Sequence, residues 1–232
     1  MLPSLTPEFA QRLHDWIVSS LAGGANVFSA GYQGTILYYD DGTVRLVVKV
    51  PPLVTWKRLL LLPLLRHEYR VYQKLADIPG IPRCYGLLAD RFLILEYIEG
   101  ASLRDGRIGD REQFFTGLRS LLGRVHAAGV AHADLKKKDN ILIAADGRPY
   151  LVDFGIACIR KPGFAPFNHW LFEMGRRFDF NAWVKHKYQR RFVDISTEDR
   201  AYLRPTLIER LARLIKQPYR AVRRRLRRFF SH

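Results

Sequence analysis

Cysteine, acidic residues and long apolar runs are all scarce in this chain of 232 residues. The two cysteines, Cys84 and Cys158, are too few for a framework of several disulfides and fit a reducing compartment. The longest run of aliphatic residues and proline, Leu59 to Leu65, is far shorter than the about 20 residues that a membrane-spanning helix needs. The first residues also lack the basic stretch and apolar core of a secretory signal. We therefore expect a cytoplasmic protein that is soluble or peripheral to a membrane.

The shortage of acidic residues leaves a strong excess of positive charge. The chain has 38 Lys and Arg against 22 Asp and Glu, a formal net charge of +16. Residues 204–232 hold ten of these basic residues and one acid, so this segment carries +9 and the preceding residues only +7. Such a balance implies an anionic partner: nucleic acid, an acidic membrane surface or a phosphorylated substrate.

The order of the predicted elements indicates an α+β protein with two lobes. A helix from Thr6 to Gly24, strands over Val27–Leu37 and Val44–Val50, and a helix over Pro63–Ala76 come first. Two further strands, a polar connector after Glu96 and a long helix follow, which is the order expected of two lobes joined by one connector. We divide the chain into a helix (1–24), a first lobe (25–97), a second lobe (98–203) and a basic amphipathic segment (204–232). The long helix is predicted over Asp110–Ala128, and the two further strands over Cys84–Leu88 and Phe92–Tyr97.

The stretch from His132 to Gly155 carries the clearest chemistry. Asp134 and Asn140 lie on a polar segment, and Asp153 ends the second of two short apolar runs that follow. A hairpin would bring two acids and an amide together, as phosphoryl transfer requires. One carboxylate can accept the proton of the acceptor, while the amide and the other carboxylate hold a metal ion.

Three features upstream of that stretch are each weak evidence alone, but together with it they indicate phosphate binding. Gly31 and Gly34 fit an ordinary turn, or a backbone that approaches phosphates closely. Lys49 fits an edge position on an apolar strand. Glu68 lies 19 residues later on the predicted helix, and a glutamate there can aim a strand lysine at phosphates.

Taken together, these features resemble the protein-kinase-like superfamily. The resemblance covers roughly residues 25–160 and implies a two-lobed kinase-like fold that binds ATP and Mg²⁺. The matching motifs, in chain order, are Ser29-x-Gly31-x-x-Gly34-x-Ile36, Val47-Val48-Lys49, Glu68, Leu95-Glu96-Tyr97-Ile98, His132-Ala133-Asp134 with Asn140, and Asp153-Phe154-Gly155.

The resemblance also implies a role for each matching residue. Asp134 and Lys136 are the predicted catalytic residues, the first as proton acceptor and the second as a contact of the transferred phosphoryl group. Asn140 and Asp153 would hold Mg²⁺. The predicted ATP-binding residues are Gly31 and Gly34 over the phosphates, Lys49 with Glu68 at the α- and β-phosphates, and the Glu96 carbonyl and Ile98 amide at adenine.

Several departures from the family pattern point to its reduced members. Six steps separate Asp134 from Asn140 where the family usually has five, so Asp139 is an alternative metal ligand, although Asn140 fits better. Ala133 replaces the arginine that reads a phosphate on the activation loop, and no Ala-Pro-Glu motif follows Gly155. The 77 residues after Gly155 are too few for a full peptide-binding lobe. We therefore expect a RIO-like enzyme or a bacterial lipopolysaccharide-core sugar kinase of the Kdo/heptose type.

The remaining residues are aromatic and basic. Residues 164–188 predict two helical pieces that pack on the second lobe, with Arg176 and Arg177 as possible contacts of substrate phosphates. Apolar residues recur every three or four positions in 204–232, with arginines between them. Such a segment suits an anionic bilayer, or it can pack its apolar stripe on the second lobe.

Our leading hypothesis is an ATP-dependent kinase of a sugar hydroxyl on an anionic glycolipid such as lipopolysaccharide core, acting at the inner face of the membrane. The alternatives are a RIO-like Ser/Thr protein kinase, and a pseudokinase or nucleic-acid-binding module. The last is disfavoured because a decayed site would be expected to lose at least one of its key residues, and all five are present: Lys49, Glu68, Asp134, Asn140 and Asp153.

Overall fold

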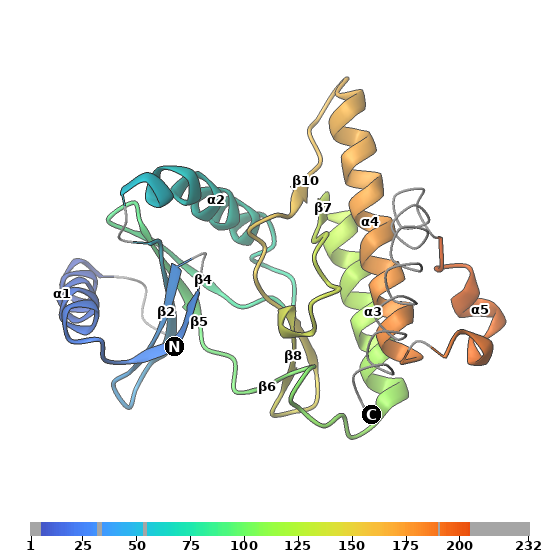
Figure 1. Ribbon diagram of the computed structural model, residues 1–232, viewed down its shortest axis with the longest axis horizontal. Coiled ribbons are helices and arrows are strands. Elements are labelled where there is room, and N and C mark those ends of the chain that lie inside the picture. The colour runs from blue at the N-terminus through green and yellow to red at the C-terminus, as the bar shows by residue number, and fades with distance from the viewer. Residues whose placement is uncertain (1–5, 32–33, 53–54, 190, 205–232) are drawn as a thin grey trace, which may run out of the picture.

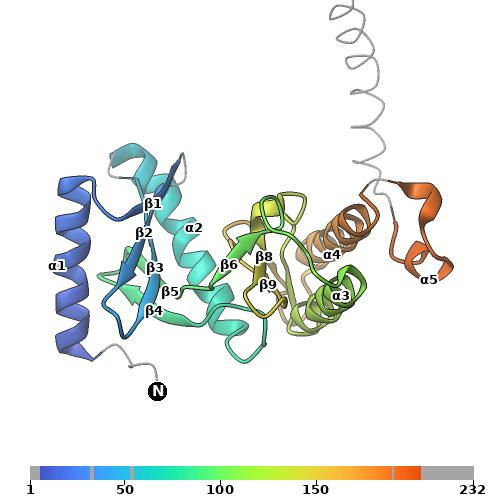
Figure 2. The same cartoon turned by 90° about the horizontal axis from the view of Figure 1, so that it is seen from below.

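The computed structural model describes residues 6–31, 34–52, 55–189 and 191–204, with the backbone alone for residues 55–60. The first lobe is a five-stranded antiparallel sheet with one helix on each face (Figures 1 and 2). The strand order is β1-β2-β3-β5-β4. The strands are β1 (Val27–Gly31), β2 (Gly34–Asp40), β3 (Arg45–Val50), β4 (Cys84–Leu88) and β5 (Phe92–Glu96).

Helix α1 (Pro7–Gly23) covers one face of this sheet. As predicted, Thr6 caps its start by accepting a hydrogen bond from the Phe9 backbone N–H (3.3 Å), and Gly24 ends it in the left-handed conformation. Leu46, Val48 and Val50 of β3 point toward α1 and are buried with it. Because side chains alternate along a strand, Lys49 points to the opposite face.

Helix α2 (Thr55–Lys74) lies on that opposite face. We predicted a helix from Pro63 to Ala76, and its start was wrong, because the helix begins eight residues earlier and contains Pro63. A proline is common in the first turn of a helix, and this preference misplaced the boundary. The part of α2 that carries Glu68 is as predicted.

A connector after β5 leads to the second lobe. There, β6 (Gly100–Ser102), β8 (Ile141–Ala144) and β9 (Pro149–Leu151) form one small sheet, and β7 (Val130–Ala131) pairs with β10 (Cys158–Ile159). The helices are α3 (Arg111–Ala127), α4 (Pro166–Lys187) and α5 (Thr197–Arg200), with short 3₁₀ turns η1 (Lys138–Asn140) and η2 (Phe192–Asp194). The prediction for α3 is confirmed, with Asp110 as its N-cap.

Helices α3 and α4 lie side by side (Figure 1). Trp183 of α4 is buried between them and donates its indole N–H to the Phe115 carbonyl (2.7 Å). The two helical pieces predicted over residues 164–188 are one helix of 22 residues. One hydrophobic core runs from Tyr72 of α2 through Phe154 to Trp183, so it joins the lobes.

The predicted amphipathic segment 204–232 lies outside the described residues, apart from Arg204. Among the helices that the structure describes, none is long and apolar enough to cross a membrane.

Candidate active site

Lys49 is held where the two lobes meet. Its ammonium group lies 2.6 Å from Glu68 Oε1 and 3.0 Å from Asp153 Oδ1. The same Glu68 oxygen accepts a hydrogen bond from the Phe154 backbone N–H (3.2 Å). Strand β3, helix α2 and the segment after β9 are therefore tied together by one buried glutamate.

These contacts keep the groups charged. Burial by itself would lower the pKa of Lys49, but the negative charge of Glu68, with smaller effects from Tyr72 and Asp153, raises that pKa above its ordinary value. Burial would likewise raise the pKa of Asp153, yet the ammonium of Lys49 holds it below the ordinary value. A positive lysine and a negative aspartate are therefore both present at neutral pH.

Asp153 has an unusual backbone. Its φ is 67°, in the left-handed region that residues other than glycine rarely adopt, and its N–H donates to the Tyr72 hydroxyl oxygen (3.3 Å). Burial of Tyr72 raises the pKa of this hydroxyl, so it remains protonated. Strained backbone of this kind is common at functional sites, where neighbouring contacts must hold it in place.

The loop between β7 and β8 brings Asp134 and Asn140 together. The Asn140 Nδ2 donates to the Asp134 carbonyl oxygen (3.2 Å) and lies 3.4 Å from Asp134 Oδ2. The Val152 N–H donates to the Asn140 carbonyl oxygen (3.1 Å), so Asp153 directly follows a residue bonded to this loop. The hairpin of β8 and β9 thus assembles the two acids and the amide.

Two lysines of the loop point in different directions. Lys137 Nζ lies 2.6 Å from Asp134 Oδ2, and this hydrogen bond raises the pKa of Lys137. Lys136 Nζ lies 4.7 Å from the ring centroid of Phe178 on α4. Lys137 is therefore the lysine beside the Asp134 carboxylate, and the catalytic role of Lys136 stays a prediction.

The other loop acid is engaged elsewhere. Asp139 forms an ion pair with Arg104, which follows β6, whereas Asn140 is buried. Because the Asn140 amide nitrogen donates to Asp134, the Oδ1 atom of Asn140 is the one that can coordinate a metal. This arrangement favours Asn140 over Asp139 as the ligand.

The donor set suits Mg²⁺. One ionised carboxylate from Asp153 and one amide oxygen from Asn140 are hard oxygen ligands, and Mg²⁺ is often held by one or two carboxylates plus substrate phosphates. The predicted metal ligands therefore fit the ion, with the phosphates of ATP and water to complete its coordination.

Asp179 of α4 supports the loop and was missed from the sequence. This fully buried carboxylate accepts hydrogen bonds from the backbone N–H groups of His132 and Ala133 (both 2.8 Å). It also lies 2.9 Å from Nε2 of the buried His126. Its one sequence signal is an acid four residues after Gly175, on the face that α4 buries.

The remaining nucleotide-binding predictions lie at expected places. Gly31 and Gly34 pair across the turn between β1 and β2, whose residues 32–33 lie outside the described part. Gly34 has φ +135°, and a Cβ added there would lie 2.1 Å from the Val50 carbonyl oxygen, so this position requires glycine. Glu96 ends β5 and Ile98 follows in the connector; their contacts with adenine stay predictions.

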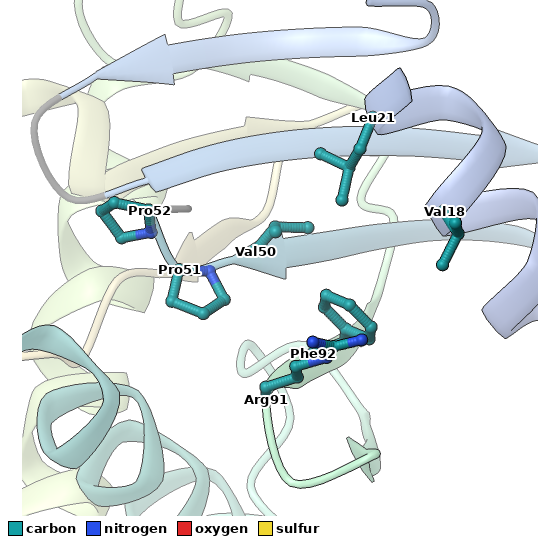
Figure 3. A pocket seen from close by; sticks show the side chains of 7 residues that line it. All are labelled: Val18, Leu21, Val50, Pro51, Pro52, Arg91 and Phe92. Atoms are coloured by element: carbon teal, nitrogen blue, oxygen red, sulfur yellow. The ribbon is translucent and has the colours of Figure 1, made fainter. Parts of the chain in front are cut away.

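A pocket of about 210 Å³ lies on the other face of the sheet. Figure 3 shows its lining, from α1, the end of β3 and the start of β5: Val18, Leu21, Val50, Pro51, Pro52, Arg91 and Phe92. Because Val50 and Lys49 point to opposite faces, this pocket is separate from the site around Lys49.

The antiparallel first lobe, the connector and the mostly helical second lobe form a protein-kinase-like fold, as the sequence predicted. No model of a known protein family matches the chain. Its sequence is nevertheless similar to those of Ser/Thr protein kinases.

Three curated relatives illustrate the similarity. The chain is 33% identical over 168 residues to serine/threonine-protein kinase SSK22 of Saccharomyces cerevisiae, a match that covers 67% of this chain and 12% of that protein. It is 26% identical over 155 residues to CBL-interacting serine/threonine-protein kinase 16 of Arabidopsis thaliana, covering 62% and 32%. It is 37% identical over 81 residues to serine/threonine-protein kinase D of Synechocystis, covering 32% and 16%. The chain thus spans about a third or less of the length of these relatives.

Proposed function

We propose that this protein is an ATP-dependent phosphotransferase that moves the γ-phosphoryl group of Mg-ATP to a hydroxyl group. The observation that carries the proposal is the position of Lys49 Nζ between Glu68 (2.6 Å) and Asp153 (3.0 Å). A lysine fixed by a helical glutamate can neutralise the α- and β-phosphates without losing its own charge. The similarity to Ser/Thr protein kinases supports the same reaction class.

Each loop residue has a defined task in this reaction. The Asp134 carboxylate accepts the proton of the attacking hydroxyl. At the same time the hydroxyl oxygen bonds to the γ-phosphorus, and the bond between the γ-phosphorus and ADP breaks. Lys137, 2.6 Å from Asp134, is a cation that can stabilise the transferred phosphoryl group. Asn140 and Asp153 would hold Mg²⁺, which would supply positive charge to neutralise the phosphates.

The acceptor that we favour is a sugar hydroxyl on an anionic glycolipid, with lipopolysaccharide core as the test case. Only residues 156–165 separate Gly155 from α4, and they contain no Ala-Pro-Glu motif. A segment this short offers little backbone for binding an extended peptide, whereas a single sugar needs only a small binding surface. The net charge of +16 suits an anionic acceptor, and we place the protein in the cytoplasm at the inner membrane face.

A Ser or Thr hydroxyl on a protein is the second candidate, because the similar proteins are Ser/Thr protein kinases. A RIO-like protein kinase would use the same residues.

A transfer assay with labelled ATP separates the candidates. Core glycolipid, delipidated core oligosaccharide and a mixture of unfolded proteins would be offered in parallel, with Asp134→Ala as the matched inactive variant. Label on saccharide that Asp134→Ala abolishes supports the first candidate, and label on protein alone supports the second. Salt-sensitive nucleic-acid binding without any Mg-ATP turnover would instead indicate a pseudokinase.

A further inference from the structure

Large apolar side chains are exposed at the start of α4. The exposed fractions are 96% for Phe164, 71% for Phe167, 54% for Trp170 and 39% for Leu171. The rings of Phe167 and Trp170 stack on each other, with centroids 5.9 Å apart. We call these four residues the α4 patch.

The α4 patch lies on a second apolar face of the helix. Phe172, Gly175 and Asp179 form the buried face toward the second lobe. Phe167, Trp170 and Leu171 recur at steps of three and four on a different side, where they meet solvent. The N-terminal end of α4 extends past α3, β7 and β10 (Figure 1), so a flat surface can reach it without meeting those elements.

Polar residues beside the patch hold it in shape. Asn168 accepts a hydrogen bond from the Lys161 N–H (2.7 Å) and donates to the Ile159 carbonyl oxygen (3.0 Å). His169 Nε2 lies 2.9 Å from the Lys161 carbonyl oxygen. The polar side chains are thus used within the protein while the apolar ones face outward, so the patch is organised before any partner binds.

The charge around the patch selects the partner. No Asp or Glu occurs from Phe154 to Phe172, and the next acid, Glu173, is paired with Arg176 (2.9 Å), whereas Arg160, Lys161 and Arg177 are exposed. A second copy of this chain, with +16, or its own segment 204–232, with +9, would bring like charge to this surface. We propose that the α4 patch docks on an anionic phospholipid bilayer, with its aromatic side chains at the headgroup level and its cations on the lipid phosphates.

This docking would also orient the active site. Residues 156–165 connect Asp153-Phe154-Gly155 directly to the α4 patch. If the proposed function is correct, a bilayer at the patch brings membrane-bound acceptors to the segment that follows Asp153. The binding itself needs no ATP, so its test is independent of kinase activity.

Tryptophan quenching by brominated phosphatidylcholine, in vesicles that also contain phosphatidylglycerol, tests the position of the patch. Segment 204–232 can hold the protein on such vesicles by charge alone, so a measurement at Trp170 itself is needed. We expect quenching in the full chain that is largely lost in Trp170→Phe, which keeps an aromatic ring but removes the reporter. Equal quenching in the two proteins would overturn the proposal.

Vesicle partitioning measures the contribution of the patch. Phe167→Ser/Trp170→Ser should weaken partitioning at least about tenfold, because two exposed aromatic rings lose their burial in the interface. The matched control is Val193→Ser, an apolar residue of η2 that is 93% exposed and lies outside the patch; it should bind as wild type. Lys161→Glu/Arg177→Glu should weaken binding to anionic vesicles more than Arg200→Glu does.

Two other results would also overturn the proposal. One is quenching of Trp170 by single-stranded oligonucleotides but not by vesicles, since aromatic and basic residues together can stack on bases. The other is a dimer of the full chain in solution that Phe167→Ser/Trp170→Ser dissociates.

Discussion

The ammonium group of Lys137 lies 2.6 Å from the Asp134 carboxylate, although the family pattern assigns the loop lysine to Lys136, one residue earlier. The loop from Asp134 to Asn140 is one residue longer than is usual in the family, and in it Lys137 is the lysine that faces the carboxylate. The ammonium of Lys136 instead lies over the Phe178 ring of α4.

This geometry predicts that Lys137→Ala lowers kcat by about 100-fold, because a cation that stabilises the transferred group is lost. Lys136→Ala should lower kcat less than Lys137→Ala does, because the Lys136 ammonium lies over the Phe178 ring and not beside the Asp134 carboxylate. Steady-state transfer rates of the two variants provide the comparison. A larger loss of kcat in Lys136→Ala than in Lys137→Ala would show that Lys136 acts on the phosphoryl group, as the family pattern assigns, despite the extra residue.

Asp179→Ala should destabilise the whole fold. The substitution leaves the N–H groups of His132 and Ala133 and the His126 ring without their buried acceptor, so we expect the free energy of unfolding to fall by about 3 kcal/mol or more. Urea denaturation followed by circular dichroism measures the change. Asp146→Ala, at an exposed turn, is the control and should change stability by less than about 1 kcal/mol. Equal stability of the two variants would rule out the supporting role of Asp179.

Local sequence signals determine some elements of this fold, whereas long-range contacts determine others. Helix α3 was predicted almost to the residue, because Asp110 at its start and Gly129 after its end are local signals. The pairing of Lys49 with Glu68 was predicted from a family spacing. Asp179 was missed because its partners are backbone groups 46 and 47 residues away, which no local pattern reveals. The orientation of Lys137 likewise depends on how the longer loop folds back.

The ion pair of Lys49 and Asp153 should make stability depend on pH at the acid end. The Asp153 pKa is depressed in the folded protein, so its contribution is present above the unfolded pKa, near 3.8, and is lost as the pH falls through the lower folded pKa. The raised pKa of Lys49 affects stability at alkaline pH, because the contribution of Lys49 to stability is lost only when the pH rises through that pKa. The stability difference between wild type and Lys49→Met should therefore be constant from pH 6 to 8 and shrink below about pH 4.

Chemical denaturation at a series of pH values measures this difference. Lys74→Met, at an exposed position near the end of α2, is the matched control and should show no such trend. A difference between wild type and Lys49→Met that is the same at pH 3 and pH 7 would contradict the coupling between Lys49 and Asp153.

The proposed phosphoryl transfer should not need phosphorylation of the segment between Gly155 and α4. Residues 156–165 contain no Ser, Thr or Tyr, and Ala133 replaces the arginine that would bind a phosphate there. Treatment with a broad-specificity phosphatase should leave the initial rate of phosphoryl transfer unchanged. A rate that falls on treatment and returns after incubation with Mg-ATP would contradict this prediction.

The most direct test of the account compares two acids of the same loop. Asp134 lies beside Asn140 and Lys137, whereas Asp139 is paired with Arg104. Mg-dependent transfer of labelled γ-phosphoryl to the acceptor would be measured for wild type, Asp134→Asn and Asp139→Asn. We expect Asp134→Asn to lose about 10²–10⁴-fold in rate, the range for a positioned general base, and Asp139→Asn to stay within about threefold of wild type. An Asp134→Asn variant as active as wild type, or a larger loss in Asp139→Asn, would contradict this expectation.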